Sequence, residues 1–167
     1  MRHLKAHRKL GRTTEHRMSM LRNMATSLVN AEKEHIITTV PKAKELRPFI
    51  EKAITLARKA QQLDGSDAKA QEVHLRRQAA RFFHAGNSQF KEEQSRFRGK
   101  KGEAKDPIER TAGVKALKRL FDELGVRYKN RNGGYTRIIR LGRRSGDNAE
   151  LAVIELVDNP RELAAKG

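Results

Sequence analysis

Apolar side chains recur every three to four positions in the first half of this chain, a spacing that places them on one face of a helix. The first run consists of Met18, Leu21, Met24 or Ala25, and Leu28. It predicts a helix from Thr14 to about residue 31, capped by Thr13 or Thr14. A second helix is expected to open at Thr39 and Pro41 and to bury the stripe formed by Ala43, Leu46, Ile50, Ala53, Ala57 and Ala60.

Two further helices are predicted in the middle of the chain. Turn chemistry at residues 63–67 is followed by a third helix that reaches about Phe83. A fourth is expected from residues 106–109, where Asp-Pro-Ile-Glu provides a cap, a first-position proline and an acid. Its apolar stripe would be formed by Val114, Leu117, Phe121 and Leu124. Gly125 is expected to end this helix, although Gly113 could instead divide it into two shorter ones.

Three segments have the pattern of β-strands. Residues 36–40 are β-branched throughout, and residues 135–141 and 151–157 are short apolar runs in the last third of the chain. In the last segment Ala152, Ile154 and Leu156 are expected to face the core, and Glu155 the solvent. Residues 142–149 form a loop too long for a tight hairpin turn. The order helix, strand, three helices, two strands predicts a two-layer α+β fold with helices packed against a small sheet.

The charge of the chain indicates its class of partner. The 167 residues include 37 Lys and Arg against 20 Asp and Glu, a formal net charge of +17. A basic domain with a pI above about 9 and clustered charge is typical of nucleic-acid binding, and the pI here is about 10.7. A membrane-surface protein would be expected to carry Trp or Phe beside its basic residues. The chain has no Trp, so nucleic acid is the favoured partner.

The basic residues are concentrated first in the N-terminal segment. Up to Gly11 almost nothing is apolar, so this segment cannot pack as a core, and its self-repulsion favours an external polyanion. Glu15 is the single acid among the first 22 residues, which carry Arg2, Lys5, Arg8, Lys9, Arg12, Arg17 and Arg22. Nucleic-acid phosphate is a dense source of the required negative charge.

A second basic cluster follows at residues 127–144 and contains no acid. Its bases are Arg127, Lys129, Arg131, Arg137, Arg140, Arg143 and Arg144. Gly133 and Gly134 lie in its middle, where glycine lets a backbone approach a phosphate closely. An ordinary turn followed by a charged strand edge is the alternative interpretation. Two such clusters in one chain favour binding.

The expected domain organisation is a single domain with extensions. Residues 1–13 form a basic N-terminal arm, and residues 14–158 an α+β domain. That domain contains a basic insert at about residues 84–110, in which the apolar periodicity is lost. Residues 159–167 are interpreted as a loose C-terminal tail.

The sequence favours neither an enzyme nor a metal protein. His3 and His7 lie on the arm and His16 lies just beyond it, without cysteine or flanking carboxylates to organise a metal site, so phosphate or ribose contacts are the favoured use. No nucleophile-elbow or zinc-protease motif occurs, and residues 99–102 lack the full phosphate-loop pattern. We therefore expect no cofactor, no small-molecule substrate and no catalytic residue. No apolar run approaches the about 18 residues of a membrane span, and the absence of cysteine is compatible with the cytoplasm.

Several multi-residue blocks resemble a known family. They are Met1-Arg2-His3, Gly11-Arg12-Thr13, His16-Arg17, residues 21–28, residues 39–47, residues 120–124, Gly133-Gly134-Tyr135-Thr136-Arg137-Ile138, residues 146–149 and residues 154–157. Over about residues 1–83 and 111–158 the chain resembles the family of the seventeenth protein of the bacterial large ribosomal subunit. The basic stretch from His84 to about Arg110 departs from the shorter members of that family.

The resemblance implies a two-layer α+β fold, no catalytic activity and a structural role on large-subunit (23S-type) ribosomal RNA, beside neighbouring large-subunit proteins. It also implies a place on the solvent side, around the nascent-peptide exit. Charge and resemblance together identify as RNA-binding candidates Arg2, His3, Lys5, His7, Arg8, Lys9, Arg12, His16, Arg17, Arg22, Asn23, Lys42, Lys44, Arg131, Gly133, Gly134, Tyr135, Arg137, Arg140, Arg143 and Arg144.

A DNA-binding protein is the competing hypothesis, because the first two helices could be taken for a helix-turn-helix. That motif needs a turn of about 3–4 residues. Here residues 31–40 intervene and are strand-like, which argues against it. An RNA-modifying enzyme would need a cluster of titratable residues that the sequence does not offer.

Overall fold

A computed structural model describes residues 7–65, 67–84, 111–160 and 162 of the chain. Its elements follow in the order α1 (Thr14–Asn30), β1 (His35–Thr39), α2 (Val40–Ala60), α3 (Ala68–Ala80), α4 (Ala112–Arg119), the π-helical turn η2 (Leu120–Leu124), α5 (Gly125–Arg127), β2 (Thr136–Arg143) and β3 (Glu150–Leu156). Helices combined with a small antiparallel sheet confirm the α+β prediction.

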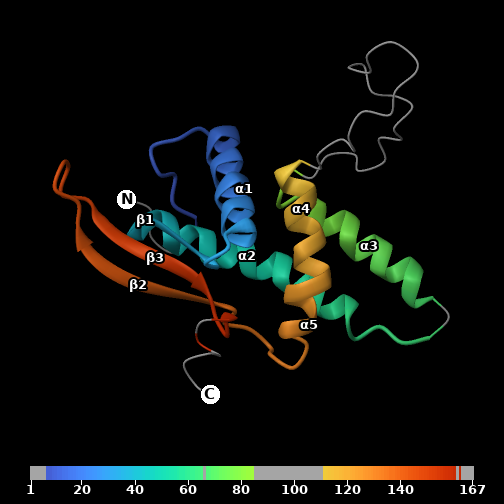
Figure 1. Cartoon of the computed structure of the whole chain (residues 1–167). Coiled ribbons are helices and arrows are strands. Elements are labelled where there is room, and N and C mark those ends of the chain that lie inside the picture. The colour runs from blue at the N-terminus through green and yellow to red at the C-terminus, as the bar shows by residue number, and fades with distance from the viewer. Residues whose placement is uncertain (1–6, 66, 85–110, 161, 163–167) are drawn as a thin grey trace, which may run out of the picture.

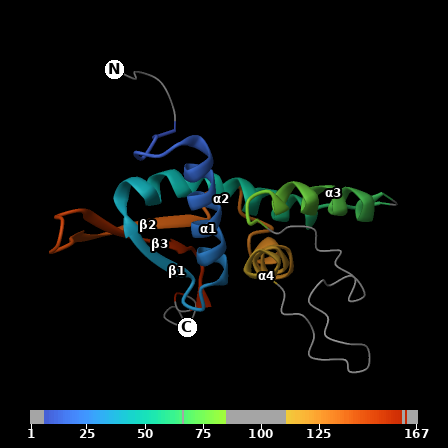
Figure 2. The same cartoon turned by 90° about the horizontal axis from the view of Figure 1, so that it is seen from above.

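The helix α2 is the centre of the molecule (Figure 1). One side of it packs against the sheet, and α1, α3, η2 and α5 contact its remaining surface (Figure 2). Its buried positions are Val40, Ala43, Leu46, Ile50, Ala53, Ile54 and Ala57. Small alanines alternate with larger aliphatic residues on this face, which lets neighbouring elements approach closely. The predicted stripe is confirmed, except that Ala60 is only partly buried.

The sheet has the order β1-β3-β2, with both pairs antiparallel. Ala152, Ile154 and Leu156 of β3 are fully buried, as predicted. The opposite face stays uncovered by described residues: Ile37, Val153 and Ile139 are aligned across the three strands, and Ile37 is 61% exposed. Glu155 lies on this outer face, where it pairs with Arg137.

The fourth predicted helix differs from expectation at its end. Gly125 does not terminate it, because the helix continues through α5 to Arg127. Gly125 has ordinary helical geometry, and a Cβ added there would lie 3.0 Å from the carbonyl oxygen of Ala57. The glycine therefore serves the close approach of two helices rather than a left-handed cap. The expected start at residues 106–109 lies outside the described residues.

Gly113 likewise does not divide this helix. It lies in α4, and a Cβ added there would collide with the carbonyl oxygen of Phe83. The buried face also differs from the predicted stripe: Ala116 and Leu120 are fully buried, whereas Val114 and Leu117 are partly exposed. The π-helical turn at Leu120–Leu124 shifts the repeat, which explains why strict helical spacing misplaced this face.

A buried carboxylate ties the helical part to the sheet. Glu34, which is 1% exposed, precedes β1 and forms ion pairs at 2.6 Å with both Arg119 and Arg127. Arg119 also donates to the carbonyl oxygens of Val29 and Ala31, at 2.6 and 3.1 Å. Because a buried charge is tolerated only when paired, this cluster is a structural element of the fold. No helix in the described part of the chain meets the length and apolarity that a bilayer crossing requires.

Candidate nucleic-acid interface

The described part of the arm is folded against the domain. The backbone nitrogen of Arg12 donates to the carbonyl oxygen of Lys9 at 3.1 Å, closing a turn in which Leu10 and Gly11 have positive φ. Arg8 forms an ion pair with Glu45 of α2 at 3.0 Å. These contacts hold the described part of the arm, from residue 7 onward, beside the first turns of α2.

The arm, the start of α2 and the tip of the β2–β3 hairpin lie on the same side of the molecule, at the left in both views (Figures 1 and 2). The register explains this placement. Thr39, the last residue of β1, pairs with Leu151, so α2 begins where the hairpin extends past β1. We call these segments, together with the first turn of α1, the arm–hairpin face; the basic residues in its described segments are Arg8, Lys9, Arg12, His16, Arg17, Lys42, Lys44, Arg140, Arg143 and Arg144.

Several cations of this face carry charge that the fold does not neutralise. Among the described residues, no carboxylate lies within ion-pairing distance of Lys9, Lys44, Arg140 or Arg143, and all four are exposed. Arg12 donates to the carbonyl oxygen of Leu10 at 3.0 Å, and its buried Nε has no hydrogen-bond partner in the described structure. Exposed, unpaired cations are the groups that counterion release on phosphate binding requires.

In the fold, some arginines of the second basic cluster are paired with acids and others are not. Its sequence contains no acid, but acids from distant segments reach it: Arg131 pairs with Asp158 at 3.1 Å, and Arg137 pairs with Glu155 and Glu162. Arg127 pairs with Glu34, and the hydrogen bond that its guanidinium donates to this carboxylate raises the pKa of Arg127. Arg140 and Arg143 are the arginines left without a carboxylate in this described segment.

Arg144 stabilises the hairpin loop itself. Its guanidinium binds Asp147 through two hydrogen bonds, at 2.8 and 2.6 Å. This contact lowers the pKa of Asp147 to about 2. The backbone nitrogen of Asn148 donates to the carbonyl oxygen of Arg144, and the nitrogen of Arg144 donates to Ala149. The loop is therefore ordered by its own residues.

Tyr135 is placed in the core rather than on the surface. It is fully buried, its ring lies 5.0 Å from that of Tyr128, and its hydroxyl donates to the carbonyl oxygen of Arg131. Burial also raises the pKa of Tyr128 to about 12. Gly133 and Gly134 before it are exposed, and Gly134 has a φ of +63°. Tyr135 therefore shapes the exposed glycine loop and does not offer its ring to an external ligand.

The remaining candidates fall into three groups. Arg2, His3 and Lys5 lie outside the described residues. His7, His16 and Asn23 are exposed, and Arg17 and Lys42 are half-buried. Arg22 lies apart from the arm–hairpin face, because its Nε donates to the carbonyl oxygen of Arg81 at 2.8 Å.

Sequence reasoning missed two features of the charged residues. Nothing in the neighbouring sequence marks Glu34 as buried, because it lies among polar residues and has the pattern of a solvent-exposed acid. Lys52 and Arg81 approach Arg22 only in the fold. In the described part of the chain, no group of three or more His, Asp or Glu side chains is arranged to hold a metal ion.

Comparison with known proteins gives a consistent result. A family model described as ribosomal protein L17 matches residues 20–157. A relative from Maricaulis maris, named large ribosomal subunit protein bL17, is 46% identical over the whole of this chain and 89% of its own length. Relatives of the same name from Bradyrhizobium diazoefficiens and Rhodopseudomonas palustris are 44% and 42% identical, over all of this chain and 90% and 89% of theirs.

Proposed function

Because the chain belongs to the ribosomal protein L17 family, we propose that it is a structural constituent of the bacterial large ribosomal subunit and binds large-subunit RNA through its arm–hairpin face. The family is a structural, non-enzymatic component of the ribosome. Its partners are then folded 23S-type RNA and neighbouring large-subunit proteins, and its place in the cell is the ribosome.

The RNA-binding proposal rests on one observation: several cations of the arm–hairpin face have no carboxylate partner among the described residues. Arg8 anchors the arm on α2, while Lys9, Arg140 and Arg143 remain exposed beside it. Phosphates of converging RNA segments would be neutralised there. Described carboxylates bind Arg127, Arg131 and Arg137, so we assign these arginines mainly to the fold. Recognition by such a surface would depend on RNA shape and 2′-hydroxyl groups more than on base sequence.

The domain organisation follows the same proposal. Residues 14–158 form one domain, supported by a continuous core that extends from Leu21 to Leu156. Residues 1–13 are assigned the role of the RNA-binding arm. The insert at about residues 84–110 and the tail at residues 159–167 receive no RNA contact in this proposal.

Sedimentation of cell lysate on sucrose gradients tests the function. Full-length protein should co-migrate with large subunits and remain there after a moderate-salt wash. A variant without residues 2–12 should be lost from the subunits at lower salt, because each removed phosphate contact weakens binding. Equal retention of both proteins would contradict the role of the arm. Full-length protein at the top of the gradient, or with chromosomal DNA, would contradict the ribosomal assignment and favour the DNA-binding hypothesis.

A further inference from the structure

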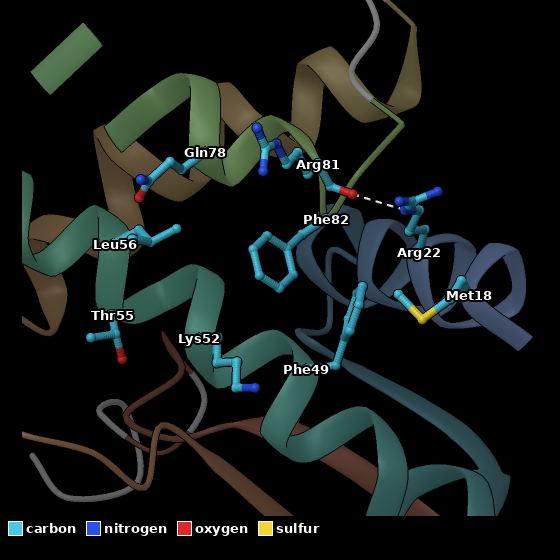
Figure 3. Close-up of a pocket in the computed structure, with 9 residues that line it drawn as sticks. All are labelled: Met18, Arg22, Phe49, Lys52, Thr55, Leu56, Gln78, Arg81 and Phe82. Carbon is cyan, nitrogen blue, oxygen red and sulfur yellow. Dashed lines mark hydrogen bonds between the residues drawn. The ribbon is translucent and has the colours of Figure 1, made fainter. Parts of the chain in front are cut away.

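A pocket of about 500 Å³ lies between α1, α2 and the end of α3, apart from the arm–hairpin face (Figure 3). Two phenylalanines form its floor. Phe49 of α2 and Phe82, just after α3, pack edge to face with ring centroids 4.9 Å apart. Both are half-buried, so part of each ring stays open to the pocket. Met18 and Leu56 complete the apolar lining, which gives a surface suited to a flat ring.

The rim of this pocket is cationic. Arg22, Lys52 and Arg81 reach it from three different elements, and no described carboxylate lines it. The Nε of Arg22 donates to the carbonyl oxygen of Arg81 at 2.8 Å, which orients the guanidinium without neutralising it (Figure 3). Lys52 and Arg81 are exposed and have no carboxylate partner among the residues that the structure describes. The rim therefore provides positive charge around an aromatic floor.

A ligand that satisfies both features carries a flat ring and a negative charge close together. An aliphatic side chain of a neighbouring protein would leave the three cations unpaired, whereas a free phosphate would leave the floor exposed. A nucleotide satisfies both, because bases stack on aromatic rings and phosphates bind Arg and Lys. The pocket volume lies within the range of about 300–1,000 Å³ that is usual for small-ligand sites.

We propose that this pocket binds one unpaired nucleotide of RNA, with the base against Phe49 and Phe82 and the phosphate at Arg22, Lys52 and Arg81. The inference rests on the proposed function, since it takes the ligand from the bound RNA. In this proposal the protein contacts RNA in two ways: the arm–hairpin face binds phosphates, and the pocket takes up a single base. The few aromatic residues of the chain suffice, because a single nucleotide needs no extended stacking platform.

Photo-crosslinking in assembled large subunits identifies the occupant. Thr55 lines the pocket, and Thr55→p-benzoyl-L-phenylalanine places a reactive ketone there. Irradiation is expected to link the protein to a single RNA position. The same replacement of Lys59, which lies on α2 outside the pocket lining, should not give that product. A crosslink to a neighbouring protein, or none to RNA, in subunits with normal protein content would overturn the proposal.

Chemical probing provides a second measurement with native side chains. Dimethyl sulfate and a carbodiimide together modify unpaired bases, and the inserted base should be protected in wild-type subunits. Lys52→Gln/Arg81→Gln should lose that protection, whereas Lys59→Gln/Arg77→Gln, which makes the same charge change on α2 and in the last turn of α3, should keep it. Unchanged reactivity in the first variant would overturn the proposal. Absence of wild-type protein from large subunits would instead overturn the proposed function.

Discussion

Arg127 binds both carboxylate oxygens of Glu34, with its terminal nitrogens at 2.6 and 2.9 Å. The two residues are 93 positions apart in the sequence, and their contact joins the residue before β1 to the end of α5. The carboxylate is 1% exposed, whereas the guanidinium is 20% exposed. Arg119 supplies a second cation at 2.6 Å. A single carboxylate thus joins the residues before β1 to two positions of the helix that runs from α4 to α5.

Glu34→Gln is expected to destabilise the protein strongly. Removing one partner of a buried ion pair typically costs about 3–5 kcal/mol, and we expect the lower end because both arginines are partly solvated. Urea unfolding followed by circular dichroism measures the change. Glu123→Gln is the matched control: Glu123 pairs with the same Arg119 but is 57% exposed, so its loss should cost less than about 1 kcal/mol. Equal midpoints for the two variants would contradict this account.

Gly125→Ala is expected to lower the unfolding free energy by about 1–3 kcal/mol, the usual cost of overpacking a tight contact. The new Cβ would lie 3.0 Å from the carbonyl oxygen of Ala57 and 3.2 Å from its carbon. Gly133→Ala is the control, because nothing lies within 4 Å of a Cβ at that position. Thermal unfolding of the two variants compares them. A Gly125→Ala variant as stable as the control would show that the helices separate without cost.

The hairpin loop is expected to lose its order only in strong acid. The pKa of Asp147 is lowered from 3.8 to about 2 by its hydrogen bonds with Arg144. A carboxyl group with a lowered pKa stabilises the fold above its ordinary pKa, and that contribution is lost as the pH falls through about 2. An NMR titration of the Asp147 carboxyl carbon measures this midpoint. In Arg144→Gln the midpoint should return toward 3.8, and an unchanged midpoint would exclude Arg144 as the cause.

Arg140→Gln/Arg143→Gln is expected to weaken RNA binding without weakening the fold, because neither side chain has a described carboxylate partner. Each phosphate contact contributes about 0.7–0.9 to the slope of log affinity against log salt. The double variant should therefore flatten that slope by about 1.4–1.8 with transcribed large-subunit RNA. Lys115→Gln/Lys118→Gln makes the same charge change on α4 and should leave the slope unaltered. Equal slopes for both variants would argue against the arm–hairpin face.

The elements built on regular repeats were predictable from the sequence. The spacing of Leu21, Ala25 and Leu28 marks the buried side of α1, and alternation in β3 identifies Ala152, Ile154 and Leu156. Local rules failed at Gly125, because its role depends on a helix more than sixty residues away in the chain. They also failed at Leu120, where a π-helical turn changes the repeat.

The number of basic residues in each cluster was predictable from the sequence, but not which of them the fold pairs with an acid. Counting bases over residues 127–144 treats Arg127 and Arg140 alike, since neither has an acid nearby in the sequence. The fold separates them, because Glu34 reaches Arg127 and no described acid reaches Arg140. Tyr135 was predicted to bind RNA because it directly follows Gly133 and Gly134 in the sequence. Its burial against Tyr128 depends on tertiary packing that no local pattern records.

The contact between Gly113 and Phe83 bears on how the length of the segment between these two residues can evolve. The chain leaves the core at Phe83 and returns at Gly113 with the two backbones touching, and Thr26 and Asn30 of α1 donate to the carbonyl oxygens of Phe83 and Ala112. Because the two ends meet, lengthening the segment between them would add only about 0.6 kcal/mol of closure entropy per doubling for a flexible chain. A change in the length of this segment therefore leaves the contacts of its two described ends in place.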